Sequence, residues 1–170
     1  MATNLQFIKS ASGIGVTSLT VADCFSSAFD IYFLNVSKGR MSDNAYVWMR
    51  FMDSSGTLIN QNEYDYASLD MYANTGFANL RNTNQSAIAN FALAQSGVDD
   101  FGGISAFIYS PFNSDLYTFV TVQSSSYSTE GRGARTIGVH KSEEQLSGIQ
   151  LNRSSGASFD MEINMYGVLS

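Results

Sequence analysis

The residues of this chain that could carry out chemistry are few. His140 is the only histidine, so any catalytic triad that moves a proton through an imidazole must use it. It lies in a stretch with strand character, and no nucleophile motif accompanies it or Cys24, the only cysteine. The sequence therefore predicts no nucleophilic catalytic site, and it predicts that His140 is a structural or surface residue.

Paired carboxylates are the remaining candidates for catalysis or metal binding. They are Glu63 with Asp65, Asp99 with Asp100, and Glu143 with Glu144. None of these pairs has the alternating ligand spacing of a calcium loop, and neighbouring carboxylates in loops are usually solvated. No Cys/His spacing fits zinc, and no glycine-rich loop fits a phosphate site. We therefore predict no catalytic residue, no metal site and no cofactor.

Two groups of aromatic residues are better candidates for contact with a partner or ligand. One group shares a strand face with Asp70 and the other shares a strand face with Arg50. Exposed mixtures of aromatic and polar side chains suit protein interfaces, and aromatic rings also stack on sugars. The alternative is that a second sheet covers one of these faces, which we favour for Trp48. The interface or ligand-contact candidates are Tyr46, Trp48, Tyr64, Tyr66 and Tyr72.

These side chains would be positioned by strands, because apolar residues recur at every second position. At the end of the chain, Met161, Ile163 and Met165 alternate with polar residues, which is typical of a half-buried strand. Similar alternation or β-branched runs predict strands over 16–21, 30–36, 46–52, 64–72, 103–109, 116–124, 134–141, 148–151 and 159–168. The sequence D-S-S-G at 53–56 predicts a hairpin turn.

The predicted fold class is therefore all-β. We expect an antiparallel β-sandwich, jelly-roll-like, with about nine or ten strands in a single domain over 1–170. At most one short helix is expected, a single turn over 22–29. The segment 84–95 fits both helix and strand periodicity, and we favour the strand. An up-and-down meander is the alternative topology.

Composition excludes several classes of partner. Charged residues make up 14 % of the chain, against about 25 % in typical soluble proteins, which favours surface that is buried in an assembly. The net charge is −6 and the nine basic residues are scattered, so we predict no nucleic-acid binding. No apolar run approaches the roughly 18 residues that span a bilayer, so we predict no membrane insertion. Cys24 is expected to be a small buried hydrophobe.

Three stretches together resemble small virion structural proteins of tailed phages, notably those of marine hosts. They are F-S-S-A-F-D-I-Y-F at 25–33, the Ser/Gly-rich region before Gly148, and the terminal stretch 159–168, which ends in Tyr166-Gly167-Val168. Members of this group often have glycine and leucine at or near the places of Met161 and Met165. The resemblance implies a jelly-roll-like sandwich, often oligomeric, on the capsid surface or tail, and it carries over no catalytic residue.

The function that this resemblance implies is that of a bacteriophage virion structural protein acting by protein–protein contacts. Capsid decoration and a tail or baseplate appendage both remain open, and the protein would be assembled in the bacterial cytoplasm. The expected partners are other phage capsid or tail proteins and further copies of the chain, as a trimer. We expect the strands over 64–72 and 46–52 to be open edges in these contacts. The alternative is a tail-fibre module that recognises a host-surface glycan, and an enzyme has less support.

Overall fold

The computed structural model describes residues 4–42, 45–94, 101–127, 129–154 and 158–169. Within these ranges twelve strands form two antiparallel sheets, and none of these residues is helical. The prediction of an all-β antiparallel sandwich is confirmed, although the expected nine or ten strands were too few. The expected helical turn over 22–29 is wrong. Those residues form a loop, in which the Tyr32 hydroxyl accepts the Ser26 N–H and donates to the Ser26 carbonyl, both at 2.7 Å.

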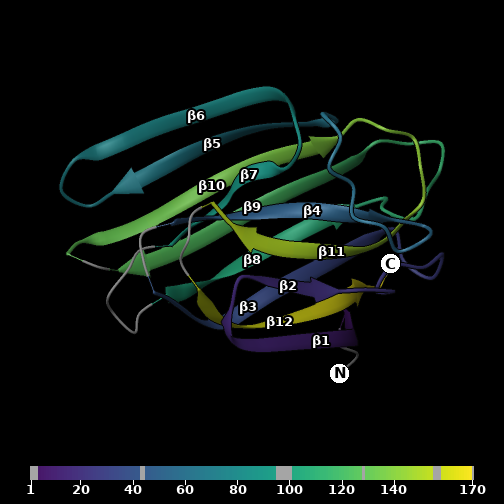
Figure 1. Cartoon of the computed structure of the whole chain (residues 1–170), viewed down its shortest axis with the longest axis horizontal. Helices are drawn as coiled ribbons and strands as arrows, with labels where there is room; N and C mark the ends of the chain where they lie inside the picture. Colours follow the sequence, from purple (N-terminus) through teal and green to yellow (C-terminus); the bar gives the residue numbers. More distant parts are fainter. Residues whose placement is uncertain (1–3, 43–44, 95–100, 128, 155–157, 170) are drawn as a thin grey trace.

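The larger sheet has eight strands and runs the full length of the molecule (Figure 1). Hydrogen bonds join neighbouring strands along the whole series, so the sheet is one continuous surface. In spatial order its strands are β1 (Leu5–Val16), β12 (Phe159–Val168), β3 (Ile31–Met41), β8 (Phe101–Tyr109), β9 (Thr118–Tyr127), β10 (Gly131–His140), β5 (Tyr64–Tyr72) and β6 (Gly76–Gln85).

The smaller sheet has four strands. In spatial order they are β2 (Ser18–Val21), β11 (Leu146–Arg153), β4 (Ala45–Asp53) and β7 (Ile88–Ala94). The strand β7 confirms the preference for strand over helix in the ambiguous segment 84–95, as far as the described residues reach. The preceding strand β6 was not predicted, because its ten residues are mostly polar and exposed.

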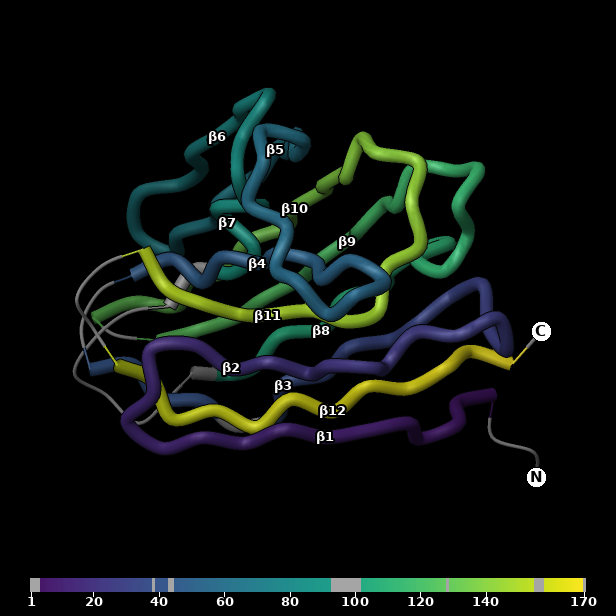
Figure 2. The backbone as a smooth tube through the Cα atoms, turned by 45° about the vertical axis from the view of Figure 1, so that its right-hand side comes forward, coloured from purple at the N-terminus to yellow at the C-terminus, as the bar shows by residue number. Residues whose placement is uncertain are grey.

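The strand order is that of a jelly roll with two inserted hairpins. Without the hairpins β5–β6 and β9–β10, the sheets become β1-β12-β3-β8 and β2-β11-β4-β7. In this arrangement the first and last strands are neighbours, as the jelly-roll prediction required, and an up-and-down meander is ruled out. Both hairpins extend the larger sheet beyond β8. Figure 2 shows the extension rising so that β5 and β6 lie beside β7.

The two inner faces enclose one apolar core. From β12, the side chains of Met161, Ile163 and Met165 are buried as their alternation predicted. From β4, Met49 and Phe51 point into the same core. Each large apolar side chain that leaves water stabilises the fold by about 1.5–3 kcal/mol. The core is therefore the main source of stability, and it holds the outer face of the eight-stranded sheet in place.

Two strands that we expected at sheet edges are internal. The strand β5 lies between β10 and β6, and β4 lies between β11 and β7. Their backbone groups are therefore already paired on both sides, and neither strand can pair with another chain. Among the described strands, the open edges are β1 and β6 of the larger sheet and β2 and β7 of the smaller one.

Candidate functional site

Tyr64 is a core residue, so its selection as an interface candidate was wrong. Its side chain is fully buried and stacks on Phe51, with ring centroids 6.3 Å apart. Its hydroxyl accepts the Phe51 N–H at 3.0 Å and donates to the Ile59 carbonyl at 3.3 Å. Burial raises the pKa of this phenol far above its ordinary value. Tyr64 therefore cannot reach a partner or ligand while the protein is folded.

Tyr72 and Tyr46 lie half-buried near the carboxylate of Asp70. Burial first, and then the charge of Asp70, raise the pKa of both phenols. The guanidinium of Arg132 lies 5.0 Å from the centre of the Tyr72 ring. These two tyrosines therefore lie near Asp70, where the larger sheet packs against β7, and each is only partly exposed.

Asp70 is the centre of a buried polar cluster that joins the two sheets. Its Oδ1 atom accepts hydrogen bonds from the Ser68 hydroxyl and the Asn90 amide, both at 2.9 Å. Thr136 donates its hydroxyl to the Asn90 carbonyl at 2.7 Å. Because Asn90 is on β7 and the other three are on β5 and β10, the cluster crosses between the sheets. This explains why Asp70 faces inward on a strand that also carries exposed apolar residues.

Trp48 is half-buried on the outer side of β4, and the Arg50 guanidinium lies 5.9 Å from the centre of its ring. Arg50 also donates from Nε to the Ser86 carbonyl at 2.8 Å. The expected pairing of Trp48 and Arg50 on one strand face is confirmed. A contact of Trp48 with a partner stays a prediction.

An exposed apolar surface lies on the outer face of the eight-stranded sheet. Eight residues in lateral register, one from each strand, form what we call the outer row. From β1 to β6 they are Phe7, Tyr166, Phe33, Phe107, Thr121, Ile137, Ala67 and Arg81.

The first four residues of the outer row are aromatic and in contact with one another. Ring centroids are 5.7 Å apart for Phe7 and Tyr166, 6.2 Å for Tyr166 and Phe33, and 5.1 Å for Phe33 and Phe107. Phe7, Phe107 and Ile137 still expose 55 %, 41 % and 59 % of their surface. A contiguous exposed apolar surface of this kind marks a site of interaction rather than ordinary protein surface.

Residues of different character flank the outer row on its two sides. One neighbouring row is mainly polar and consists of Asn164, Asn35, Ser105, Gln123, Arg135, Leu69 and Asn79. The row on the other side includes Tyr109, Phe119, Val139 and Asp65. The apolar surface of the outer face therefore continues into the row of Phe119 and Val139, and a polar row borders it on the other side, as polar residues border the apolar centre of many interfaces.

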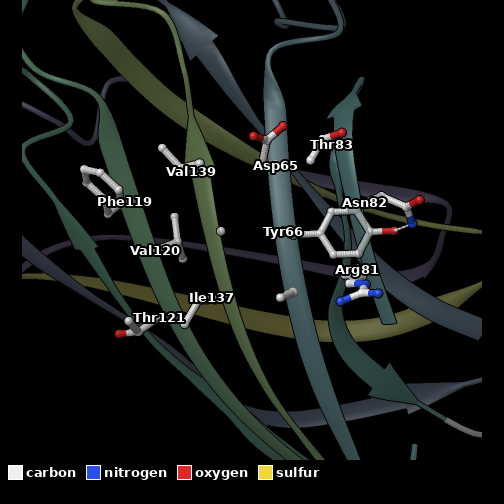
Figure 3. Close-up of a pocket in the computed structure, with 12 residues that line it drawn as sticks. Asp65, Tyr66, Arg81, Asn82, Thr83, Phe119, Val120, Thr121, Ile137 and Val139 are labelled. Carbon is white, nitrogen blue, oxygen red and sulfur yellow. Dashed lines mark hydrogen bonds between the residues drawn. The ribbon is translucent and has the colours of Figure 1, made fainter. Parts of the chain in front are cut away.

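A groove of about 780 Å³ lies on this face over β5, β6, β9 and β10. Of the five aromatic candidates, Tyr66 alone lines it, and its hydroxyl accepts a hydrogen bond from the Asn82 amide at 2.9 Å. In Figure 3, Tyr66, Arg81 and Asn82 lie on one side and Phe119 on the other. The Tyr66 ring itself packs against the core, so the groove offers the exposed Phe119 ring together with the Asp65 carboxylate and the Arg81 guanidinium.

His140 is buried at the end of β10, which confirms the prediction of a structural histidine. Its Nε2 atom lies 3.3 Å from Oε2 of Glu63 and 3.6 Å from Oε1 of Glu144. Burial lowers the pKa of the imidazole, and the two carboxylates oppose that effect only in part. Sequence reasoning placed Glu63 and Glu144 in separate carboxylate pairs and did not connect them to His140. The pair Asp99 and Asp100 lies outside the described residues.

The residues of the outer row were missed because their strands carry apolar residues on both faces. In β9, Val120 and Val122 are buried while Phe119 is half-exposed. In β10, Ile137 and Val139 share one face as predicted, but that face is the outer one. In β3, adjacent Tyr32 and Phe33 place an aromatic residue on each face, which was the available signal.

No family model matches the chain, and no curated protein matches it. Among solved structures it is similar to the CBM2 module of the evolved Dit of Lactobacillus casei BL23 phage J-1. The two are 10 % identical, with a TM-score of 0.25, over 90 % of this chain and 70 % of that one. A TM-score this low does not establish a shared fold. Within the described residues there is also no helix of the length and apolarity needed to cross a membrane.

Proposed function

We propose that this chain is a structural protein of a bacteriophage virion that works by protein–protein contact. The virion part of the proposal rests on the resemblance of the stretches 25–33 and 159–168 to small phage structural proteins. The contact part rests on one observation, the outer row, in which four neighbouring strands carry contacting aromatic rings and Phe7, Phe107 and Ile137 are exposed. Capsid decoration and a tail or baseplate position both fit this proposal.

The outer row has the dimensions of a protein interface. Seven steps between neighbouring strands, at about 4.8 Å each, make the row roughly 34 Å long. Together with the flanking row on each side it covers roughly 700 Å², since outward residues recur about every 6.8 Å along a strand. A standard-size interface buries roughly 600–1,000 Å² on each partner. The surface is thus large enough to support a specific contact by itself.

The partner that we propose for this surface is a second copy of the chain. The outer row ends at the open edges of β1 and β6, which are twelve and ten residues long. Lys9 is the only charged residue of β1 and Arg81 is the only one of β6, so charge hardly protects these edges from pairing. A closed homo-oligomer covers both the apolar face and the edges. The phage resemblance gives the trimer as its stoichiometry.

Two experiments test this function. Mass spectrometry of virions purified from the phage that encodes the chain should detect it as a stoichiometric component. Absence from the particles contradicts the virion proposal. Chemical cross-linking of the purified protein, followed by peptide mapping, should join Lys141, which pairs with Asp65 beside the outer row, to Lys141 of another copy. Cross-links confined to single copies contradict the self-contact.

The groove favours a second candidate function, the recognition of a host-surface glycan. Its volume of about 780 Å³ lies within the 300–1,000 Å³ typical of small-molecule sites. The exposed Phe119 ring offers a stacking surface for a sugar, and the Arg81 guanidinium and Asp65 carboxylate offer polar contacts. This function would use the same face of the sheet as the self-contact.

A glycan array with the purified protein tests this second candidate. Phe119→Ala should abolish any binding that the wild type shows, because Phe119 exposes 53 % of its surface at the groove and its loss removes the stacking ring. Ile14→Ala is the matched control, since Ile14 is 88 % exposed and does not line the groove. Equal binding by the wild type and Phe119→Ala would exclude this groove as the site.

A further inference from the structure

Three potential metal ligands converge where β5 begins and β10 ends. The imidazole Nε2 of His140 lies 3.3 Å from a Glu63 oxygen and 3.6 Å from a Glu144 oxygen. One ligand atom from each of the three residues lies within 4.8 Å of both others. Glu63 and His140 are 77 positions apart in the sequence, so the pairing of two strands creates this cluster.

The backbone and core hold two of the three residues in place. His140 pairs in register with Tyr64, and the next amide, that of Lys141, donates to the Glu63 carbonyl at 2.8 Å. The imidazole is fully buried, with its ring centroid 5.0 Å from that of Tyr64 and 5.9 Å from that of Phe51. The ring therefore has little freedom to turn, and its Nε2 atom is held toward the two carboxylates.

The two carboxylates of this cluster, those of Glu63 and Glu144, have no lysine or arginine partner among the described residues. Lys141, the nearest cation in sequence, instead bonds the Asp65 carboxylate at 2.8 Å and the Asn84 side chain at 2.7 Å. Two carboxylates thus converge on one imidazole nitrogen, at 3.3 Å and 3.6 Å.

We propose that Glu63, His140 and Glu144 bind a divalent transition-metal cation, with zinc as the best fit. Zinc takes nitrogen and carboxylate ligands at about 2.0–2.2 Å, which places tetrahedral ligand atoms about 3.4 Å from one another. The distances from Nε2 to the two carboxylates match this spacing. The imidazole ligand favours zinc and its neighbours over calcium or magnesium, which prefer oxygen.

The metal would fasten the turn after β10 to the start of β5. Glu144 lies in the connection to β11, and about a third of its side chain is exposed, so it can close on an ion from the solvent side. Water would complete the coordination at this exposed side. The role that follows is structural. It goes beyond the sequence-based prediction, which contained no metal site.

Titration of the metal-free, tag-free protein with zinc chloride tests this site, with calorimetry as the readout. The wild type should bind one ion per chain. Glu63→Gln and Glu144→Gln should each weaken binding by at least about tenfold to a hundredfold, the loss that follows removal of even an outer-shell partner. Glu143→Gln is the matched control, because Glu143 is the exposed neighbour outside the cluster. Its affinity should equal that of the wild type.

A second readout follows the metal ligand itself. His140 is the only histidine, so its ring nitrogens give a single unambiguous set of NMR signals. Zinc should shift the Nε2 resonance of the wild type, and the shift should vanish in Glu144→Gln while the rest of the spectrum stays that of a folded protein. An unchanged histidine signal, no saturable binding, or equal loss in Glu143→Gln would overturn the proposal.

Discussion

Phe33 of β3 and Phe107 of β8 lie directly opposite each other on the outer face of the eight-stranded sheet. Their ring centroids are 5.1 Å apart, with an angle of 45° between the ring planes. The pair continues through Tyr166 to Phe7, so four neighbouring strands present aromatic rings side by side. If this sheet served only to cover the core, its aromatic rings would be expected on the inner face. Here they add to the surface that a partner can cover.

Tyr64→Phe should destabilise the fold by about 1–3 kcal/mol. The substitution keeps the ring but removes the acceptor of the buried Phe51 N–H, and an unsatisfied buried donor costs that much. Urea denaturation at pH 7 measures the free energy of unfolding. Tyr117→Phe, at an exposed position, is the control and should change it by less than about 0.5 kcal/mol. Equal stability of Tyr64→Phe and the wild type would show that Tyr64 is not in the core.

Gly148→Ala should cost about 1–3 kcal/mol, because a methyl group has no space there. An added Cβ would overlap the carbonyl oxygen of Val21 and lie 2.9 Å from Cα of Ala22, which forces β2 away from β11. Gly131→Ala is the matched control, since its nearest neighbour would be 3.9 Å away. Thermal unfolding of both variants measures the difference. A control that loses as much stability as Gly148→Ala would contradict the described packing of β2 on β11.

The Cys24 thiol should be nearly unreactive in the folded protein. Burial raises its pKa to about 12, and only 2 % of the residue is exposed. At pH 8 its thiolate fraction is then on the order of a thousandfold below that of a free cysteine with a pKa of about 8.5. Reaction with a chromogenic disulfide reagent should therefore be slow until urea unfolds the chain. Rapid labelling of the folded protein would place this thiol at the surface.

Asp53 should give the turn after β4 a measurable pH dependence. The Ser55 hydroxyl and then the Thr57 N–H hold the pKa of this carboxyl below its ordinary value of 3.8. The stabilisation is therefore present above pH 3.8 and is lost as the pH falls through the lower folded-state pKa. Asp53→Asn cannot titrate at this position. The difference in unfolding free energy between Asp53→Asn and the wild type should stay constant above about pH 5 and shrink in acid. A difference that does not change with pH would contradict these hydrogen bonds.

Period-two alternation predicted which residues share a strand face, but not always which face points inward. Met161, Ile163 and Met165 were assigned correctly because the face that they share is apolar, while Glu162 and Asn164 mark the opposite face as the outer one. In β5 both faces are mixed. The outcome there depends on Asp70, which is buried with Asn90 of β7 as one of its hydrogen-bond donors. That partner belongs to a distant segment, so local sequence could not reveal it.

The candidate sites show the same limit. The outer row and the cluster of Glu63, His140 and Glu144 both arise from strand pairing over long sequence separations. No motif spacing links their members. Jelly-roll topology was predictable, since the last strand had to find partners early in the chain, but the two inserted hairpins were not. These hairpins carry Phe119, Ile137 and the groove.

Light scattering of the purified protein tests the central claim that the outer row is a self-contact surface. At micromolar concentration the wild type should have three times the 18.5 kDa mass of one chain, and Phe107→Ser should reduce it to a single chain. Ile14→Ser, at an even more exposed position of β1 away from the outer row, should keep the wild-type mass. A wild-type mass of 18.5 kDa, or an unchanged assembly in Phe107→Ser, would contradict the account.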